Sequence, residues 1–216
     1  MEYTEPRLAT SALLTIDTQC DVALPGAVME IPGTMDVTPN IKSLLSAYRT
    51  CGLPVIHIVR LYLTDGSNVD LCRRSLVEEG TCVLAPHSPG AEVVPDLKPC
   101  PDAKLDAEVL LKGKIQTWGS KEFVIYKPRW GAFFQTPLHD HLRTLGVDTL
   151  VFCGCNFPNC PRTTIYEASE RDYKIVLVED AISRIYEEGK RELGRIGVRI
   201  WPTSILLEKM AAGADG

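Results

Sequence analysis

The chain lacks several features that would place it in large classes of proteins. Its 216 residues contain no N-terminal signal of the charged-then-apolar kind. They also contain no apolar run of about 18 residues, which a membrane-spanning helix requires. The formal net charge is −5 and the basic residues are scattered, which argues against a surface for nucleic acid or anionic lipid. We therefore expect a cytoplasmic protein that acts on a small molecule and binds neither nucleic acid nor a membrane.

Paired C-x-x-C motifs are also missing, although the chain has eight cysteines. A structural zinc site is therefore not expected, and without a secretory signal the cysteines are expected to be reduced thiols. The composition, with 45% hydrophobic and 24% charged residues, is typical of a soluble globular protein with a sizeable core. It predicts a single domain over residues 1–216.

Short apolar runs alternate along the chain with segments of helical spacing. Strands are expected at 12–16, 54–59, 123–126, 149–153, 175–178 and 198–201, and helices at 37–51, 136–145, 187–196, 204–210 and from 160. Repeated β-then-α order predicts an α/β protein, a three-layer α/β/α fold with a parallel, Rossmann-like six-stranded sheet.

Residues 60–121 are rich in Pro, Gly and Asp and break this alternation. They are expected to form a long connection with a short helix at 71–79 and a short edge strand at 108–111. Long connections of this kind often form lids or binding loops.

Cys160 is the most informative residue because it opens a helix directly after a buried strand. Asn159 is a suitable N-cap, and Pro161 falls in the first turn, where its missing N–H is harmless. The free N–H groups at a helix start carry partial positive charge, which lowers the pKa of a thiol and binds an oxyanion. The alternative interpretation is a buried structural cysteine.

Two further residues follow predicted strands in the same way. Asp17 follows the first strand and Lys127 follows the strand at 123–126. Sites in parallel sheets lie beyond the carboxyl ends of the strands, so Asp17, Lys127 and Cys160 are expected at one edge of the sheet. An acid, an ammonium and a thiol together predict a cysteine hydrolase. Taken singly, Asp17 is equally consistent with a strand-end cap and Lys127 with a solvated surface lysine.

Aromatic and basic residues near these positions are candidates for substrate binding. Trp130 and Phe133 are expected to form an apolar wall, with Phe134 in the core. Arg60 and Arg162 are expected to pair with a carboxylate or polar group, because arginine presents a planar fork of donors. The alternatives are ordinary core positions for the aromatics and a salt bridge to a neighbour for Arg162.

Four spaced motifs occur in order along most of the chain. They are Asp17-x-Gln19; Lys127 with Gly131, Ala132, Phe133, Thr136 and Leu138; Gly154 with Cys160, Arg162 and Thr164; and Val178 with Asp180 and Ala181. Together they resemble the motifs of the isochorismatase-like cysteine hydrolases. That family includes nicotinamidases, N-carbamoylsarcosine amidase, biuret hydrolase, ureidoacrylate amidohydrolase and streptothricin hydrolase.

The resemblance implies roles for the residues that match. Cys160 becomes the nucleophile, Asp17 the general base and Lys127 the charge that favours the thiolate, while Gln19 becomes a candidate substrate contact. It also implies a cis peptide bond before the cysteine, which would join Cys155 to Asn156, with Phe157–Pro158 as a second candidate. The backbone N–H groups of Asn156 and Cys160 would then form the oxyanion hole.

The resemblance further implies hydrolysis of a carbon–nitrogen bond without a metal or cofactor. Isochorismatases proper lack this cysteine, and the D-x-H motif with which nicotinamidases bind metal is absent from residues 57–65. His57 is then expected to be a packed core histidine. The expected substrate is a small linear amide, a carbamoyl or ureido compound, or a lactam as in streptothricin hydrolase. The unusual loop 155–160 and the segment 100–122 are both expected to border the pocket.

Two other functions remain open at this point. One is a non-catalytic or regulatory protein on the same fold. The other is a thiol redox protein that uses Cys153, Cys155 and Cys160. The resemblance also implies a homo-oligomer, dimer or tetramer, with the apolar stretch 182–186 expected at an exposed interface.

Overall fold

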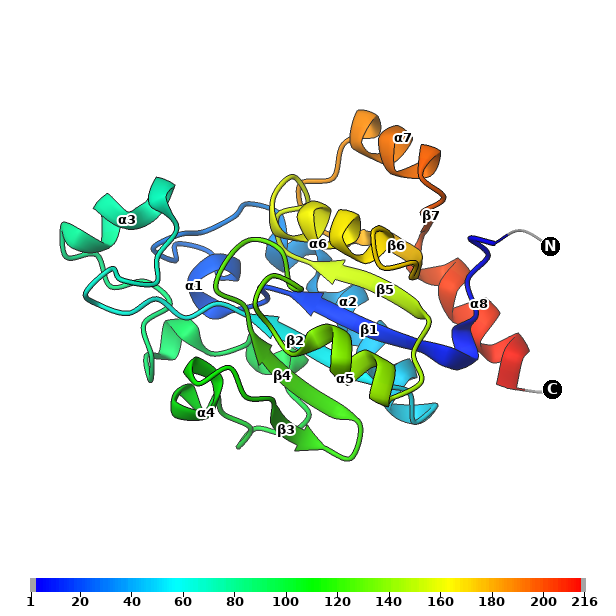
Figure 1. Ribbon diagram of the computed structural model, residues 1–216, viewed down its shortest axis with the longest axis horizontal. Helices are drawn as coiled ribbons and strands as arrows, with labels where there is room; N and C mark the ends of the chain where they lie inside the picture. Colours follow the sequence, from blue (N-terminus) through cyan, green and yellow to red (C-terminus); the bar gives the residue numbers. More distant parts are fainter. Residues whose placement is uncertain (1–2, 215–216) are drawn as a thin grey trace.

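The computed structural model describes residues 3–214, in which helices cover both faces of a central sheet (Figure 1). The strands are β1 (Ser11–Ile16), β2 (Val55–Val59), β3 (Gln116–Gly119), β4 (Glu122–Tyr126), β5 (Thr149–Gly154), β6 (Lys174–Ile182) and β7 (Arg199–Trp201). Their order in the sheet is β3-β4-β2-β1-β5-β6-β7. Every neighbouring pair is parallel except β3 with β4. The α/β/α prediction is confirmed.

The sheet has seven strands rather than the predicted six. The additional strand, β3, lies at the edge, where only alternate residues are partly buried, so its sequence carries a weak apolar signal. The edge strand predicted at 108–111 is wrong, because those residues belong to helix α4 (Ala107–Leu111). Asp106 caps that helix by accepting a hydrogen bond from the Val109 N–H, and Ala107 and Leu110 share its buried side.

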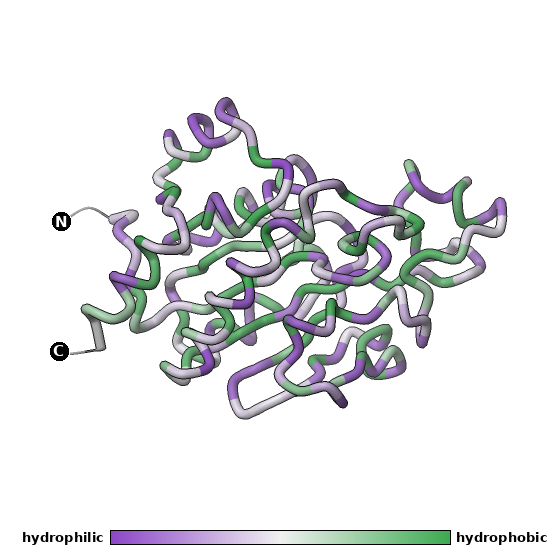
Figure 2. The backbone as a smooth tube through the Cα atoms, turned by 180° about the vertical axis from the view of Figure 1, so that it is seen from behind, coloured by the Kyte–Doolittle hydropathy of each residue, from purple (hydrophilic) through white to green (hydrophobic). Residues whose placement is uncertain are grey.

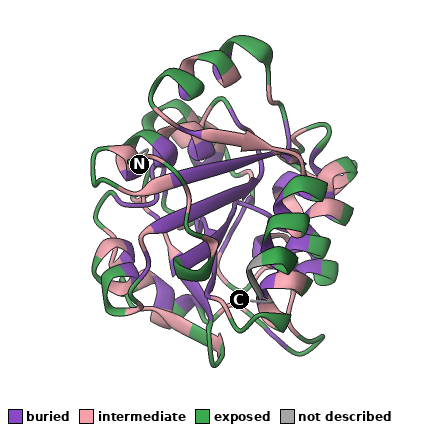
Figure 3. Cartoon of the chain, turned by 90° about the vertical axis from the view of Figure 1, so that its right-hand side faces the viewer, coloured by how far each residue is buried: buried purple, intermediate pink, exposed green. Residues whose placement is uncertain are grey.

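The central strands are hydrophobic and buried (Figures 2 and 3), and their apolar side chains alternate between two cores, one on each face of the sheet. Leu13 and Val151 face α2 (Thr34–Thr50) and α8 (Thr203–Ala214), whereas Leu14 faces the opposite layer. That second layer consists of α5 (Leu138–Thr144), α6 (Cys160–Ser169) and α7 (Glu187–Arg195). The sheet is therefore buried on both sides, as its near-continuous apolar strands predict.

The remaining helices are short and lie mainly in the connections that follow β1 and β2. They are α1 (Cys20–Ala23), α3 (Leu71–Glu78) and the 3-10 turns η1 (Leu8–Thr10), η2 (Pro89–Ala91) and η3 (Pro95–Leu97). The short helix predicted at 71–79 is confirmed by α3, which projects beyond the carboxyl ends of the strands (Figure 1). Among residues 3–214, no helix combines the length and apolarity needed to cross a bilayer.

His57 is a packed core histidine, as predicted. Its Nδ1 is 2.8 Å from Thr15 Oγ1 and its Nε2 is 2.8 Å from Glu122 Oε1. Arg49 donates to the same carboxylate. Burial lowers the pKa of His57, so the ring is neutral and serves to satisfy polar groups between strands.

Gly154 ends β5 at a position where no side chain fits. A Cβ there would lie 2.3 Å from Ile16 O and 2.6 Å from Ile16 N, and its φ is +123°. We expect Gly154→Ala to lower the free energy of unfolding by about 3 kcal/mol, through backbone strain and displacement of β1. Urea unfolding followed by circular dichroism measures this loss.

Gly194 is the matched control for this substitution. It lies inside α7, and a Cβ there meets nothing within 4 Å. Gly194→Ala should therefore be neutral or stabilise by about 0.5–1 kcal/mol. Equal stability of the two alanine variants would contradict the close approach of Gly154 to β1.

Candidate active site

The candidate residues lie at the carboxyl ends of four strands, where backbone hydrogen bonds fix their positions. The Asp17 N–H donates to Ile58 O at 2.9 Å, and the Lys127 N–H donates to Val59 O at 3.0 Å. On the other side of β1, the Cys155 N–H donates to Ile16 O at 2.8 Å. The hydrogen bonds of the sheet thus continue beyond its strands and fix the backbone on which the site is built.

Asp17, Lys127 and Cys160 meet at this edge of the sheet, as the sequence predicts. Lys127 Nζ lies 2.9 Å from Asp17 Oδ2 and 3.2 Å from Cys160 Sγ. Lys127 is 0% exposed, so the interpretation of a solvated surface lysine is wrong. Asp17 and Cys160 are also buried. A buried ammonium between a carboxylate and a thiol is costly unless paired, and here it has both partners.

The Asp17 carboxyl is ionised despite its burial. Burial alone raises its pKa, but the positive charges of Lys127 and Arg60 and a hydrogen bond with the Cys160 thiol together hold the pKa below its ordinary value. Its Oδ1 accepts no hydrogen bond of ordinary geometry from residues 3–214. A buried carboxylate oxygen of this kind is suited to accept a proton.

The Cys160 thiol is protonated, in contrast to the expectation from its helix position. The residue begins α6 and Pro161 lies in the first turn, as predicted, but the Asn159 side chain before it makes no capping hydrogen bond. Burial, together with the negative charge of Asp17, nevertheless raises the pKa of Cys160 to about 11, and the cations Lys127 and Arg60 offset this only in part. The partial charge of the helix terminus is therefore outweighed by desolvation of the thiolate.

This protonation state predicts a steep pH dependence for alkylation of Cys160. Iodoacetamide reacts with the thiolate, so its rate at Cys160 should rise about tenfold per pH unit from pH 6 to 9, below the pKa of about 11. Peptide mapping by mass spectrometry measures the rate at each cysteine, with the exposed Cys51 and Cys100 as internal references. A plateau below pH 8 would instead indicate a resting thiolate.

The loop before Cys160 turns without a cis peptide bond. Residues 3–214 contain none, so both predicted positions, Cys155–Asn156 and Phe157–Pro158, are wrong. The chain turns instead at Asn156, whose φ is 62°, a conformation that asparagine tolerates better than most residues. Asp17, with φ 49°, shares this left-handed conformation. Backbone of this kind is often found at functional sites.

The predicted oxyanion hole is only partly in place. Cys160 is the first residue of α6, so its N–H precedes the hydrogen-bond ladder of the helix. The Asn156 N–H, however, donates to Ser183 Oγ at 2.8 Å. Ser183 Oγ also accepts from Thr34 Oγ1 at 3.0 Å. In this arrangement the second donor is held by Ser183 and is available to an oxyanion only after that bond breaks.

A small cavity of about 20 Å³ opens onto Asp17 and Cys160. Three kinds of residue line this cavity: the polar residues Asp17, Arg60, Arg73 and Asn156, the thiols Cys155 and Cys160, and the apolar residues Val22, Met29, Ile31 and Leu84. Roughly 10–15 Å³ suffices for one water, so a substrate enters only when the apolar residues move. The segment 100–122 contributes no lining residue, contrary to expectation.

Arg73 and the apolar residues were missed by sequence reasoning. Arg73 lies on α3, in the segment predicted to form a binding loop, but its spacing from Arg60 carries no recognisable signal. Arg60 itself lines the cavity as predicted.

Gln19 positions Arg60 and does not face the cavity. Its Oε1 accepts from the Arg60 N–H at 2.7 Å. Its Nε2 donates to Arg60 O at 2.8 Å and to Ala91 O at 2.6 Å. Both amide protons are used and the side chain is fully buried. The predicted substrate contact is therefore replaced by a structural one.

The other predicted substrate contacts do not line the cavity. The Phe133 ring packs against Tyr173 in the core, and Trp130 stacks under the Arg73 guanidinium, whose carbon is 5.9 Å from the ring centroid. Arg162 pairs with Glu192 of α7 and with the Tyr186 hydroxyl, which is the salt-bridge alternative. Phe134, expected in the core, is 46% exposed.

Of the cysteines that a redox function would need, Cys155 and Cys160 both line the cavity, and Cys153 lies apart from it. Cys153 lies in the core that faces α2, whereas Cys155 packs beside the cavity. All eight cysteines are free thiols. Burial raises the pKa of Cys155 to about 12, so its thiol is protonated too. Among residues 3–214 no group of three or more His, Cys, Asp or Glu side chains is placed to hold a metal.

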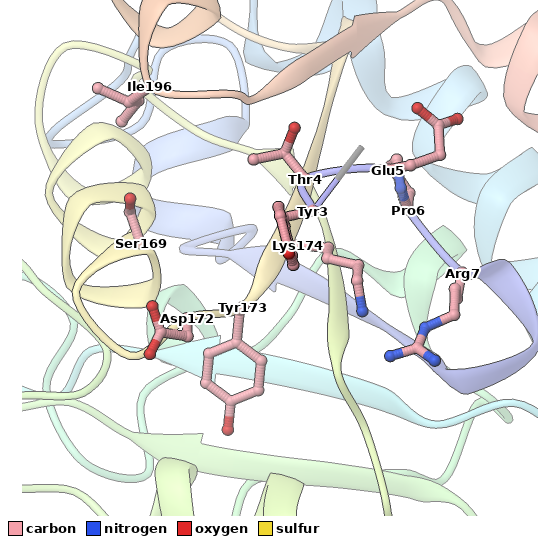
Figure 4. Close-up of a pocket in the computed structure, with 10 residues that line it drawn as sticks. All are labelled: Tyr3, Thr4, Glu5, Pro6, Arg7, Ser169, Asp172, Tyr173, Lys174 and Ile196. Atoms are coloured by element: carbon pink, nitrogen blue, oxygen red, sulfur yellow. The ribbon is translucent and has the colours of Figure 1, made fainter. Parts of the chain in front are cut away.

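A larger cavity of about 750 Å³ lies at the opposite end of the sheet (Figure 4). It is formed between residues 3–7 and the junction of α6 with β6, where Lys174 begins the strand. Its cations Arg7 and Lys174 both pair with Asp148. It lies at the amino ends of the strands and contains no cysteine, so the candidate chemistry resides at Cys160.

The stretch 182–186, predicted to be an exposed apolar interface, is less exposed than expected. Ile182 and Ser183 are buried within the chain, and Tyr186 packs its ring against Phe157 while remaining partly exposed. Apolar exposure in this stretch is therefore confined to Ile185 and Tyr186.

Comparison with known proteins finds one matching family model and several relatives. A family model described as the isochorismatase domain matches residues 11–121 and 106–194. A protein of Arabidopsis thaliana named "Probable inactive nicotinamidase" is 31% identical over 199 residues, covering 89% of this chain and 92% of its own length. A ureidoacrylate amidohydrolase of Methylobacterium radiotolerans is 29% identical over 188 residues, covering 80% and 67%.

A solved structure resembles the whole fold. It is the crystal structure of an isochorismatase family protein from Desulfovibrio vulgaris, with a TM-score of 0.80 and 34% sequence identity. The match covers 94% of this chain and 98% of that one.

Proposed function

We propose that this chain, which belongs to the isochorismatase domain family, is a cysteine hydrolase. The proposal rests on that membership and on the geometry around Cys160. The reaction is cleavage of a carbon–nitrogen amide bond through a thioester, without a metal. The substrate is a small linear amide, a carbamoyl or ureido compound, or a lactam. The single observation that carries the proposal is the buried Lys127 ammonium, which contacts both the Asp17 carboxylate and the Cys160 sulfur beside a cavity.

Acylation begins with transfer of the thiol proton. Asp17 accepts it as Cys160 Sγ attacks the carbonyl carbon, and negative charge moves to the carbonyl oxygen. Because the pKa of the thiol is about 11 and that of Asp17 is lowered, proton transfer accompanies formation of the C–S bond. The Lys127 ammonium stabilises the sulfur while it is anionic. Asp17 then gives the proton to the leaving nitrogen, and the C–N bond breaks.

Deacylation reverses these roles with water as the nucleophile. Asp17 removes a proton from the water as its oxygen attacks the thioester carbonyl. The tetrahedral intermediate collapses, the C–S bond breaks, and the thiolate recovers its proton from Asp17. The Cys160 N–H stabilises the oxyanion in both halves, and the Asn156 N–H joins it once it leaves Ser183. One such donor is worth about 3 kcal/mol in comparable sites.

The relatives support a hydrolase of this class, with one alternative. The ureidoacrylate amidohydrolase, by its name, acts on a carbon–nitrogen bond. The Arabidopsis relative, by its name, is inactive as a nicotinamidase, which favours a non-catalytic role on the same fold as the second candidate. In this chain the acid, the ammonium and the thiol are all in contact, which the second candidate does not require.

A substrate panel with capture of the intermediate tests the proposal. The purified protein is incubated with linear amides, ureido acids and lactams, with and without chelator, and ammonia release and product mass are recorded. Quenching at short times should reveal the protein heavier by one acyl group, bound to the peptide that contains Cys160. Turnover that requires a metal, or an adduct on another residue, would contradict the mechanism. Absence of turnover across the panel favours the non-catalytic candidate.

A further inference from the structure

The charges around the cavity do not balance. Lys127, Arg60 and Arg73 contribute three positive charges, whereas Asp17 and Asp70 contribute two negative ones. The Cys160 thiol is neutral at pH 7, since its pKa is about 11. One positive charge therefore has no counterpart beside the reacting sulfur. Arg73, which carries this excess charge, is only partly buried, and a bound anion gives it the charged partner that the protein does not.

Arg60 supplies a buried donor that has no partner in the protein. Its side chain is 2% exposed, and its Nη2 donates to Asp70 Oδ2 at 2.8 Å. Its Nη1 donates to no group among residues 3–214, although it is buried. Buried guanidinium donors are nearly always satisfied, so an unpartnered Nη1 in a residue that lines the cavity points to a ligand that accepts from it.

Arg73 brings the uncompensated charge. Its Nη1 donates to the Tyr62 hydroxyl at 2.9 Å, and its guanidinium lies over Trp130. Neither partner is a carboxylate, and no salt bridge to Arg73 is present in the described part of the chain. Asp70 accepts hydrogen bonds from Arg60 and Tyr62 at Oδ2, and its Oδ1 accepts none from residues 3–214. Arg73 lines the cavity together with Asp17 and Cys160, which places its charge within the site.

We propose that the substrate carries a carboxylate, which Arg60 and Arg73 bind while its amide or ureido carbonyl lies against Cys160. A carboxylate fits both the charge and the geometry. It brings one negative charge to a site with one in excess, and its two oxygens match the planar forks of arginine. A phosphate dianion would bring two negative charges and leave the site with one negative charge in excess. This inference rests on the proposed function and adds the class of substrate, an amide or ureido acid.

The position of the two arginines limits the length of this substrate. Arg60, Arg73, Asp17 and Cys160 line a single cavity, so a carboxylate bound by the arginines and a carbonyl held against Cys160 lie close together. The apolar residues Met29, Ile31 and Leu84 cover the same space and have no polar group for a longer chain. A compact molecule, with a few bonds between the carboxylate and the carbonyl, is therefore expected.

Two matched pairs of compounds test the proposal. N-carbamoylglycine is compared with N-carbamoylglycinamide, and succinamic acid with succinamide, because each pair differs in one carboxylate. We expect kcat/KM to favour the acid by about 100-fold, the range in which a desolvated charge-assisted pair discriminates. Arg73→Gln should lower that preference at least tenfold, mainly through KM, and Arg73→Lys should restore part of it. Arg191→Gln, which removes a mostly exposed arginine of α7, is the control and should leave the preference unchanged.

Binding to an inactive variant separates this inference from the proposed function. Calorimetric titration of Cys160→Ala with succinamic acid and with succinamide does not depend on turnover. Tighter binding of the acid, lost in Cys160→Ala with Arg73→Gln, supports carboxylate recognition even if no amide is hydrolysed. Equal binding of the two compounds, or an equal kcat/KM within each pair, would overturn it. Turnover without preference thus rejects the carboxylate alone, whereas binding without turnover rejects the hydrolase alone.

Discussion

Cys160→Ser is expected to reduce kcat by about 10⁴-fold or more while leaving the fold intact, as removal of a nucleophile does in comparable enzymes. The hydroxyl occupies nearly the same volume and still reaches Lys127, whose Nζ is 3.2 Å from the sulfur. Its proton is far harder to remove than that of the thiol, and Asp17, with its lowered pKa, is a weak base. Assays with the substrate found in the panel, at matched unfolding midpoints in urea, measure the loss.

Cys155→Ser is the control for this substitution. Cys155 lines the same cavity, is buried, and also has a raised pKa, but its sulfur accepts a hydrogen bond from Thr34, whereas Lys127 donates to Cys160. Its replacement should change kcat less than about threefold, since it removes no group that the reaction uses. Loss of activity in both variants would favour the redox interpretation, in which the two thiols act together. More than a tenth of the wild-type rate in Cys160→Ser would refute the nucleophile.

The positions of the three reacting residues were predictable because each follows a strand. Strand ends are local features, and the rule for parallel sheets converts them into a common edge without knowledge of side-chain packing. Asp17 and Lys127 are the first residues after β1 and β4, and Cys160 opens α6 after a five-residue loop from β5. The shared motifs carry the same information. The six predicted strands are present for the same reason, since buried parallel strands have near-continuous apolar sequences.

Side-chain direction was not predictable in the same way. Gln19, Phe133 and Arg162 all lie within a few residues of a reacting group, yet each points to a partner distant in the sequence, namely Arg60, Tyr173 and Glu192. Those partners are chosen by packing between elements, which a local pattern does not contain. Arg73 shows the converse, because α3 brings it to the cavity from a segment with no motif.

The pKa of Cys160 was predicted to be lowered but is raised, for a related reason. The sequence shows a helix start, which lowers the pKa of a thiol, but it does not show that Cys160 is 6% exposed and lies beside Asp17. Burial and the neighbouring anion are tertiary properties, and they dominate here. The consequence is mechanistic: the structure makes the thiol depend on Asp17 as a base, where a resting thiolate would not.

That dependence makes Asp17→Asn the second substitution with a large expected effect. The amide cannot accept the thiol proton, so kcat/KM should fall by about 10³–10⁴-fold, as for loss of a general base. Lys127, which is 0% exposed, also loses its counter-ion, and the free energy of unfolding should fall by about 3–5 kcal/mol. Activity is measured at pH 7 and stability by urea unfolding.

The double variant Asp17→Asn with Lys127→Met separates the two effects. Removing the orphaned ammonium as well should recover most of the lost stability, because a buried ion pair is often replaced by apolar groups without net cost. It should recover no activity, since neither the base nor the cation is present. Recovery of turnover in the double variant would show that the single substitution acted only through misfolding, and that Cys160 is activated by another group. Recovery of stability alone would show that a stable fold is not sufficient for turnover when the carboxylate and the ammonium are absent.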